Sequence, residues 1–341
     1  MKKTLLFLIL LAAIVIISTI IFRNGIKLKG LSDLVSSKSS HSKKYAIGVV
    51  LTGGAYQQAF DGLRYQLAKE GYNEGENVSF IIRDVRGDTS KLPEAIQSLL
   101  GENPDLIYAI STPVTSEVKK LASSDIPIVF NAVGDPLGAG FIKSYSRTET
   151  NLTGCSNLSA ELSGKRLEIF KEAFPGIDRV VTFYNPENSF STLSIQNLRP
   201  AAMALGINLR EFEVKNTDEL RDALAALKTG EYDGIYVVPD AMVVSNIDLV
   251  IQKSLELNIP SMAHEQTLME QGVSLAYGAN FYDLGSQCAS TVISILSGQK
   301  PDNIPVITPS KLDIIVNLKQ IKESGREIDS AITTEADKVI F

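Results

Sequence analysis

The alternation of apolar, β-branched segments with amphipathic helical segments from residue 45 onward constrains the fold most strongly. The segments YAIGVVLT, NVSFIIRDV, DLIYAIST and IPIVFNA are typical of buried strands. Helical patterns separate them, and in the first of these Phe60, Leu63 and Leu67 recur at helical spacing. Strict alternation of this kind predicts an α/β fold in which helices cover both faces of parallel sheets.

A second series of the same kind begins after a connector at residues 145–156. We predict its strands at DRVVTFYNP, INLREFEVK, GIYVVPD, IPSMAHE and GVSLAYGAN, again with helical segments between them. A length of 341 residues fits roughly two domains of about 150 residues each. Because crossovers between parallel strands are right-handed, the two series predict two doubly wound lobes.

The N-terminus carries a separate signal. Lys2 and Lys3 precede an uncharged apolar run at residues 4–22. At about 1.5 Å per residue, a helix of this length nearly spans a hydrocarbon core of about 30 Å. We predict a signal anchor at residues 1–23, or alternatively a cleaved signal peptide, followed by a flexible linker at residues 24–44. The expected location is extracytoplasmic, either anchored in the membrane by this helix or secreted after cleavage.

Charge and the rare residue types exclude several function classes. A net charge of -6 argues against a nucleic-acid partner, which usually requires a basic face. Cys155 and Cys288 lack CxxC spacing and a neighbouring His, so we expect no metal site and no cofactor. We interpret the two cysteines as unpaired core residues, and a disulfide between them stays open. His264 is interpreted as a structural residue near a strand end.

Polar or small residues follow nearly every predicted strand. In open α/β sheets, ligands bind beyond the carboxyl ends of the strands, so these residues are candidates for ligand binding. Most are equally good helix N-caps, and the two tyrosines among them are either core aromatics or rings that stack on a ligand. The candidates are Thr52, Gly53, Ser111, Thr112, Asn131, Asp135, Tyr184, Asn185, Ser189, Asp240, Tyr277 and Asn280.

Reaction machinery is missing from the sequence. There is no GxSxG elbow, no Walker A pattern and no GxGxxG after the first predicted strand. Hydrogen-bonding side chains at strand ends without a nucleophile and base are typical of a binding cleft. We therefore predict a binding protein and not an enzyme.

An ordered set of longer stretches carries a family resemblance across residues 45–341. Among them are FDGLRYQLAKEGYNEGENVSF, IPIVFNAVGDPLGAGFIKS, GKRLEIFKEAFPGIDRVVTFYNPENS and QGVSLAYGANFYDLG. With these stretches the chain resembles the substrate-binding proteins of ABC transporters, in the family that includes bacterial tryptophan- and tyrosine-binding lipoproteins. It departs from that family in lacking a lipobox cysteine.

The resemblance implies a type I periplasmic-binding-protein fold, with two lobes joined by three crossovers near residues 150, 278 and 306. Lobe 1 would comprise residues 45–150 plus 279–306, and lobe 2 residues 151–278 plus 307–341. The implied function is that of an extracytoplasmic solute-binding protein of an ABC importer. It would capture a small polar ligand, such as an amino acid and in particular an aromatic one, by hinge closure. Its partners would be that ligand and the transmembrane subunits of the permease. The alternative is a membrane-tethered ligand-binding sensor that works with a separate receptor.

For an amino-acid ligand, charge suggests the roles of the candidate residues. The ligand carboxylate would meet hydroxyls and backbone N–H groups at Thr52, Ser111 and Thr112. The ligand ammonium would meet Asp240, with Asp135 as a second carboxylate. Tyr184 or Tyr277 would stack on an aromatic ring of the ligand.

Overall fold

The computed structural model describes residues 44–341. The predicted signal anchor at residues 1–23 and the linker up to residue 43 lie outside the described residues. Within residues 44–341, no helix combines the length and the apolar character that crossing a membrane requires.

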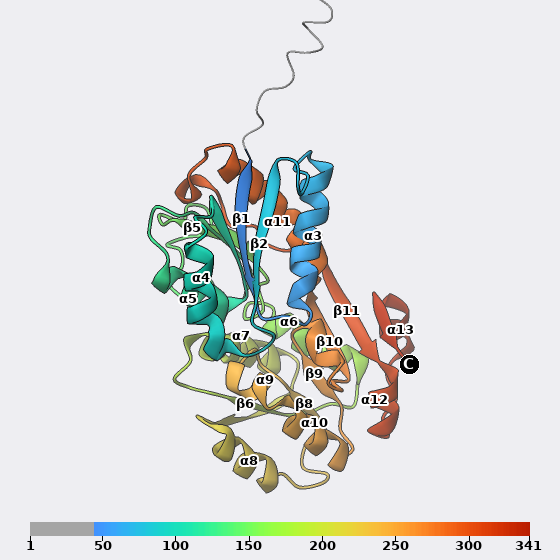
Figure 1. Ribbon diagram of the computed structural model, residues 1–341. Coiled ribbons are helices and arrows are strands. Elements are labelled where there is room, and N and C mark those ends of the chain that lie inside the picture. The colour runs from blue at the N-terminus through green and yellow to red at the C-terminus, as the bar shows by residue number, and fades with distance from the viewer. Residues whose placement is uncertain (1–43) are drawn as a thin grey trace, which may run out of the picture. The chain divides into compact units, whose positions relative to one another are not determined.

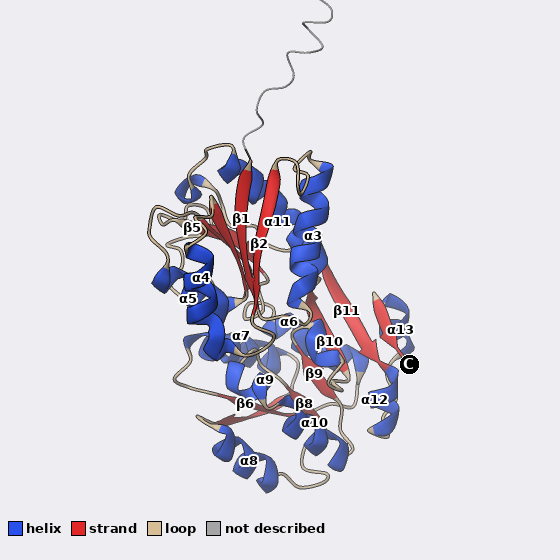
Figure 2. Cartoon of the chain, viewed as in Figure 1, coloured by secondary structure: helices blue, strands red, loops and turns tan. Residues whose placement is uncertain are grey.

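The first sheet has five parallel strands in the order β2-β1-β3-β4-β5 within the described residues. Figures 1 and 2 show β1 and β2 side by side in this sheet. Its strands are β1 (Tyr45–Leu51), β2 (Val78–Asp84), β3 (Leu106–Ile110), β4 (Ile128–Val133) and β5 (Leu152–Ser156). Its helical elements are α3 (Tyr56–Lys69), η1 (Thr89–Lys91), α4 (Leu92–Leu100), α5 (Thr112–Leu121), α11 (Phe281–Leu296) and η3 (Pro301–Asn303). Strands β3 and β4 are buried along their whole length, because helices cover both faces of the sheet. We call this sheet and its helices the first lobe.

The second sheet has seven strands in the described residues, in the order β12-β11-β10-β9-β8-β6-β7. They are β6 (Arg179–Tyr184), β7 (Asn208–Glu213), β8 (Gly234–Tyr236), β9 (Ser261–Ala263), β10 (Leu275–Ala279), β11 (Leu312–Asn317) and β12 (Lys338–Ile340). The helical elements are α6 (Ser163–Ala173), α7 (Ser189–Ala204), α8 (Thr217–Ala226), α9 (Ala241–Ser245), α10 (Ile247–Glu256), η2 (Gln266–Met269), α12 (Leu318–Glu323) and α13 (Ser330–Glu335). We call this sheet and its helices the second lobe.

The predicted α/β class with parallel sheets is confirmed, with one exception in the second sheet. Strand β11 runs antiparallel to β10, whereas the other pairings are parallel. The chain leaves the second sheet at the carboxyl end of β10, forms α11 in the first lobe and then returns. It re-enters the second sheet from the edge that it left, so β11 has to run in the opposite direction.

Within the described part, the chain passes between the lobes after Ser156, at Asn280 and between Ile307 and Leu312. The first predicted crossover, near residue 150, precedes β5, which pairs with β4 in the first sheet. The sequence LTGCS has no apolar alternation. Its Gly154 is required because an added Cβ would lie 2.0 Å from the Phe130 carbonyl oxygen. A strand of this kind is recognised only from its partner.

Helix α11 packs closely on α3 and so brings a late segment of the chain into the first lobe. Two glycines make the approach possible. A Cβ on Gly62 would lie 2.0 Å from the Tyr282 carbonyl oxygen, and a Cβ on Gly285 would lie 2.0 Å from the Ala59 carbonyl oxygen. The two backbones therefore meet without side chains between them.

Cys155 and Cys288 form a disulfide between β5 and α11, with their Cα atoms 6.0 Å apart. The interpretation of two unpaired core cysteines is therefore wrong. Both residues are fully buried, as expected, but 133 positions separate them in the sequence. Only the packing of α11 against the first sheet brings the two sulfur atoms together.

Candidate functional site

Polar strand ends of the two lobes meet across one interface. We call it the interlobe face and define it by the residues that follow β1, β3 and β4 in the first lobe and β6, β8, β9 and β10 in the second. Gln266 Nε2 of the second lobe donates a hydrogen bond to Gln58 Oε1 of the first at 2.7 Å. A Cβ added to Gly134, after β4, would lie 2.1 Å from Cζ of Phe190 in α7. The two lobes are thus in contact at this face.

Ser111, at the carboxyl end of β3, has an unusual local structure. Its φ of 93° is rare for a residue with a side chain, and such strain is concentrated at functional sites. The residue is buried, and its hydroxyl has no hydrogen-bond partner in the described part of the chain. Although Ser111 occupies the N-cap position of α5, its side chain does not cap the helix. Thr112 follows as the first residue of α5 and is half-buried.

The turn after β1 also requires a special backbone. Gly53 has a φ of 74°, and a Cβ there would lie 3.2 Å from Asp84 Oδ1. The carbonyl oxygen of Thr52 accepts a hydrogen bond from Gly87 N at 2.8 Å. The hydroxyl of Thr52 is the polar side-chain group of this turn, and the residue is half-buried. Thr52 and Gly53 lie at the strand end that the sequence indicated.

Asn131 and Asp135 have different environments although both follow the same apolar run. Asn131 is fully buried, and its Nδ2 donates to the Leu284 carbonyl oxygen at 3.3 Å, which ties β4 to α11 inside the first lobe. Asp135 lies beyond the end of β4, and its Oδ1 accepts from Gly138 N at 2.8 Å. Asn131 therefore has a structural contact, and Asp135 closes a turn beside the interlobe face.

Asp240 is saturated by hydrogen bonds from the protein itself. Its Oδ1 accepts from the backbone N–H groups of Met242 and Val243 at 2.9 and 3.0 Å, which caps α9. Its Oδ2 accepts from Asn185 N at 2.9 Å and from the Ser191 hydroxyl. Four donors fill the acceptor positions of one buried carboxylate. The structure thus gives Asp240 a capping role and leaves no free position for the ligand ammonium assigned to it.

Ser189 and Tyr184 also have local roles in the second lobe. Ser189 is exposed at the start of α7, and the residue that caps this helix is Asn188, whose Oδ1 accepts from Phe190 N at 2.9 Å. Tyr184 is buried in the apolar core beside α6 and α7, and its hydroxyl donates to Glu213 Oε1 at 3.1 Å. Neither side chain is directed at the first lobe by these contacts.

Asn280 links the two lobes at the second crossover. Its Oδ1 accepts from Asp283 N at 3.2 Å and caps α11 in the first lobe. Its Nδ2 donates to Asp313 Oδ2 in β11 of the second lobe at 2.8 Å. Tyr277, three residues earlier, is half-buried in β10.

Arg166 is a buried charged residue that the sequence did not single out as a candidate. The residue is 0% exposed in the first turns of α6. Its Nε donates to the Tyr277 carbonyl oxygen at 2.8 Å, and its Nη1 donates to the Tyr236 hydroxyl at 3.2 Å. Its Nη2 has no hydrogen-bond partner, and no carboxylate of the described residues lies within ion-pair distance. A fully buried arginine without a counter-ion is rare.

The spacing of residues along α6 indicates that Arg166 is buried. Arg166 shares a helix face with Ser163, Phe170 and Ala173, and all four are buried. The stretch GKRLEIFKEA contains several charges, so Arg166 resembled a solvated residue among others of the same kind.

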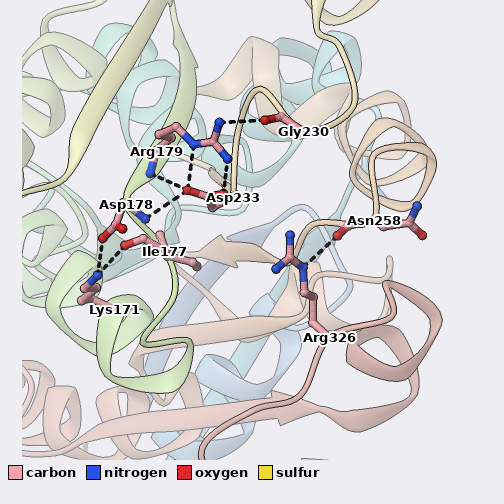
Figure 3. A network of polar contacts seen from close by, with 8 residues as sticks. All are labelled: Lys171, Ile177, Asp178, Arg179, Gly230, Asp233, Asn258 and Arg326. Carbon is pink, nitrogen blue, oxygen red and sulfur yellow. Dashed lines mark hydrogen bonds and ion pairs between the residues drawn. The ribbon is translucent and has the colours of Figure 1, made fainter.

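Arg179, at the amino end of β6 in the second sheet, shows how an arginine is ordinarily paired (Figure 3). It binds the Asp233 carboxylate through Nε at 3.1 Å and Nη2 at 2.6 Å. Its Nη1 donates to the Gly230 carbonyl oxygen at 2.7 Å. Each end of this guanidinium has an acceptor, although the side chain is partly exposed. The contrast identifies the buried, incompletely paired Arg166 as the unusual group.

Glu265 lies near Arg166 at the carboxyl end of β9. It is 7% exposed, and its Oε1 accepts from the Thr267 hydroxyl. His264 Nε2 lies 3.8 Å from its Oε2. Burial raises the pKa of Glu265, whereas the Thr267 hydrogen bond and the Arg166 charge act in the opposite direction. Burial and then the Arg166 charge lower the pKa of His264 to about 3, so its imidazole is neutral at neutral pH.

The charge of Glu265 acts across the interlobe face. The negative carboxylate, followed by burial, raises the pKa of the phenol of Tyr56, the first residue of α3. The Tyr56 ring stacks on Phe281 with centroids 5.3 Å apart and an interplanar angle of 17°. Glu265 of the second lobe therefore faces an aromatic pair of the first.

Other features do not form a competing site at this face. Across residues 44–341, no group of three or more His, Cys, Asp or Glu side chains is arranged to hold a metal ion. A hollow of about 640 Å³ in the first lobe is lined by Pro127 and Asn151, which precede β4 and β5. It therefore lies at the amino ends of the strands, away from the polar strand ends.

Comparisons with known proteins agree on the kind of protein. Residues 44–340 match the family model described as ABC transporter substrate binding protein. A tyrosine-binding protein from Clostridioides difficile (strain R20291) is 28% identical over 285 residues, which cover 83% of this chain and 81% of that protein.

Solved structures show the same architecture. A ligand-free, open structure of a substrate-binding protein with adhesive properties from Clostridium difficile has a TM-score of 0.70 at 29% identity, covering 87% of this chain and 99% of that chain. An ABC domain in complex with L-Trp from Streptococcus pneumonia has a TM-score of 0.76 at 24% identity, covering 87% of this chain and 100% of that chain. These similarities confirm the periplasmic-binding-protein type of fold. The homologues are solute-binding proteins and not enzymes, as the sequence predicted.

Proposed function

Because the chain belongs to the family of ABC transporter substrate-binding proteins, we propose that it captures an amino acid between its two lobes and delivers it to an ABC permease. The observation that carries this proposal is the buried Arg166, which contacts Tyr236 at the end of β8 and Tyr277 in β10 and whose guanidinium lacks a carboxylate partner from the described residues. A buried cation is stable only when an anion or strong acceptors complete its surroundings. The carboxylate of an amino acid would be that anion.

The ligand class is supported by the relative named tyrosine-binding protein, at 28% identity. An aromatic amino acid also suits the stacked Tyr56 and Phe281 of the first lobe and Phe190 of the second. Tyr56 and Phe190 are half-buried and replace Tyr184, which lies in the core of the second lobe, as candidates for contact with a ligand ring. Phe281 is fully buried and supports Tyr56 from behind. Thr52, Ser111 and Asp135 supply polar groups from the first lobe.

The mechanism that we propose is hinge closure about the three connecting segments. In the open state a ligand enters and contacts one lobe, and in the closed state both lobes bind it. The ligand shifts the equilibrium toward closure to the extent that it binds the closed state more tightly. Asn280, which bonds elements of both lobes, would be a pivot of this motion.

The proposed location is extracytoplasmic, with the transmembrane subunits of a permease as the partner. Attachment to the membrane through residues 1–23 is part of this proposal. The sensor alternative gains no support from the family assignment.

A ligand panel tests the function. The purified protein is heated with each of the standard L-amino acids, with sugars and with nucleosides, and calorimetry measures affinity for each hit. We expect at least one L-amino acid to raise the melting temperature, because a ligand that binds only the folded state stabilises it. If sugars or nucleosides bind and no amino acid does, the ligand class is wrong. Mass spectrometry of co-purified small molecules gives an independent check.

A further inference from the structure

We propose that Arg166 and Glu265 bind the two poles of a zwitterionic α-amino acid, Arg166 its carboxylate and Glu265 its ammonium group. This inference rests on the proposed function, because it specifies how that same interlobe site recognises its ligand. It replaces the earlier assignment of the ammonium to Asp240.

Arg166 has an unused donor that is suited to a carboxylate. Two of its nitrogen atoms bind neutral acceptors, the Tyr277 carbonyl and the Tyr236 hydroxyl, and Nη2 has no partner among residues 44–341. Ser163 lies one turn earlier on the same helix face, and its buried hydroxyl also lacks a partner in the described residues. A guanidinium and a hydroxyl together form charge-assisted hydrogen bonds to a carboxylate. Both donors lie in the first turns of α6, where the helix dipole also favours an anion.

Glu265 has the complementary lack of a cationic donor. The residue is nine-tenths buried, and the Thr267 hydroxyl is the donor that contacts its carboxylate. The adjacent His264 lies 3.8 Å away and carries no charge at neutral pH. The ammonium group of a ligand would supply both the missing charge and up to three N–H donors.

The two charges are neighbours that do not pair with each other. Arg166 donates to the carbonyl oxygen of Tyr277. The next residue, Gly278, lies against the residues that follow β9. A Cβ on Gly278 would lie 2.2 Å from the His264 carbonyl oxygen and 4.0 Å from Glu265 Cα. Arg166 and Glu265 thus flank the same end of β10 without an ion pair between them among the described contacts. A zwitterion placed there satisfies both, whereas an anionic ligand is repelled by Glu265 and a cationic one by Arg166.

The other acidic residues near the face fit the ammonium less well. Asp240 accepts four hydrogen bonds from the protein. Asp135 uses one oxygen to close its turn with Gly138. Glu161 is exposed and accepts a hydrogen bond from the Tyr145 hydroxyl at 3.1 Å. Glu265 is therefore a buried carboxylate with unused acceptor capacity that also lies next to Arg166. Burial raises its pKa, and the charge of Arg166 acts to lower it.

Calorimetry with three related probes tests the assignment on the wild-type protein. L-Tyrosine carries both charged groups, tyramine lacks the carboxylate, and 3-(4-hydroxyphenyl)propionate lacks the ammonium group. We expect L-tyrosine to bind at least about 30-fold more tightly than either analogue, since each analogue leaves one buried charge unpaired. If the panel selects another amino acid, that amino acid and its two corresponding analogues replace these probes.

Variants then assign each pole to a residue. Arg166→Gln should weaken L-tyrosine binding at least about 30-fold and abolish the preference for L-tyrosine over tyramine. Glu265→Gln should also weaken L-tyrosine binding at least about 30-fold, and it should abolish the preference for L-tyrosine over 3-(4-hydroxyphenyl)propionate. Arg179→Gln, at the amino end of β6, is the matched control and should leave affinity within about twofold. Arg166→Lys keeps the charge and should restore part of the preference if Arg166→Gln folds poorly.

The outcomes separate the two proposals. If the wild type binds L-tyrosine and both glutamine variants bind it within about threefold, the assignment of the poles is wrong and the function stands. The same holds if either analogue binds the wild type as tightly as L-tyrosine. If no amino acid binds the wild type at all, the proposed function fails, and the assignment fails with it.

Discussion

The side-chain amide of Gln266 in η2 donates a hydrogen bond to Gln58 Oε1 in α3 at 2.7 Å, and this bond joins the second lobe to the first. Gln58 is exposed and Gln266 is half-buried, so the bond stabilises the contact between the lobes without contributing to either core. We predict that Gln58→Ala weakens ligand affinity by about 2- to 10-fold, because a net hydrogen bond contributes about 0.5–1.5 kcal/mol to the closed state. Calorimetric titration measures the change.

A neighbouring glutamine provides the control for the Gln266–Gln58 hydrogen bond. Gln66 lies on the same helix and donates to Glu70 Oε1 at 2.9 Å within the first lobe. Gln66→Ala should leave affinity unchanged. Equal effects of the two substitutions would show that the bond between the lobes has no special part in closure.

Ligand affinity should rise with pH in the weakly acidic range. Glu265 pairs with an ammonium group only when ionised, and burial raises its pKa above the ordinary value of about 4.3. Affinity should therefore be lost as pH falls through this raised pKa. The groups that face Glu265 are His264, Arg166 and Tyr56. The pKa of His264 is lowered to about 3 and that of Tyr56 is raised well above its ordinary value, so neither changes its protonation between pH 5 and 8. Titrations from pH 4 to 8 check the trend, and Glu265→Gln should flatten the curve.

The unliganded protein should show the opposite contribution from the same residue. Because the folded-state pKa of Glu265 is raised, the folded state binds its proton more tightly than the unfolded state. The contribution of Glu265 to the free energy of unfolding is thus fully present below the unfolded pKa and declines as pH rises through the folded pKa. Urea unfolding of wild type and Glu265→Gln over this pH range isolates that contribution. We expect the stability of the wild type relative to Glu265→Gln to decrease as pH rises, and a relative stability that increases with pH would contradict the assigned shift.

Gly62→Ala should destabilise the first lobe by about 1–3 kcal/mol, the usual cost of overpacking. The added Cβ would lie 2.0 Å from the Tyr282 carbonyl oxygen, and a backbone atom cannot move aside as a side chain does. In an open helix position the same change would stabilise the protein slightly. Gly101→Ala is the control, since its Cβ would be 3.5 Å from the nearest atom, an ordinary contact. Urea unfolding compares the two, and equal stabilities would rule out the close approach of α3 and α11.

Reduction of the Cys155–Cys288 disulfide should lower the free energy of unfolding by about 2–4 kcal/mol, because the bond closes a long loop in the unfolded chain. Equilibrium unfolding in urea with and without dithiothreitol measures this difference. A Cys155→Ala, Cys288→Ala double variant should not respond to the reductant. Two thiols that alkylate in the denatured, unreduced protein would show that the bond is absent.

Local sequence patterns were sufficient for strands β1–β4 and β6–β10 and for the edge at which polar side chains gather, but not for β5, β11 and β12. Apolar periodicity and N-cap residues act over three or four neighbouring residues, so they can be interpreted in any single segment. Asp240 and Asn280 illustrate the limit of this information: both were recognised as strand-end residues, and their capping bonds confirm the alternative interpretation of such residues. The candidate ligand contacts at Thr52, Ser111 and Asp135 remain predictions.

The sequence by itself thus determined the α/β class, the two sheets and the family to which the chain belongs, because these depend on short-range periodicity and on an ordered set of motifs. The tertiary structure alone decided the direction of β11, the pairing of Cys155 with Cys288 and the burial of Arg166 beside Glu265. Each of these depends on which distant segments pack together, and a charge acquires its energetic importance only when packing removes it from water.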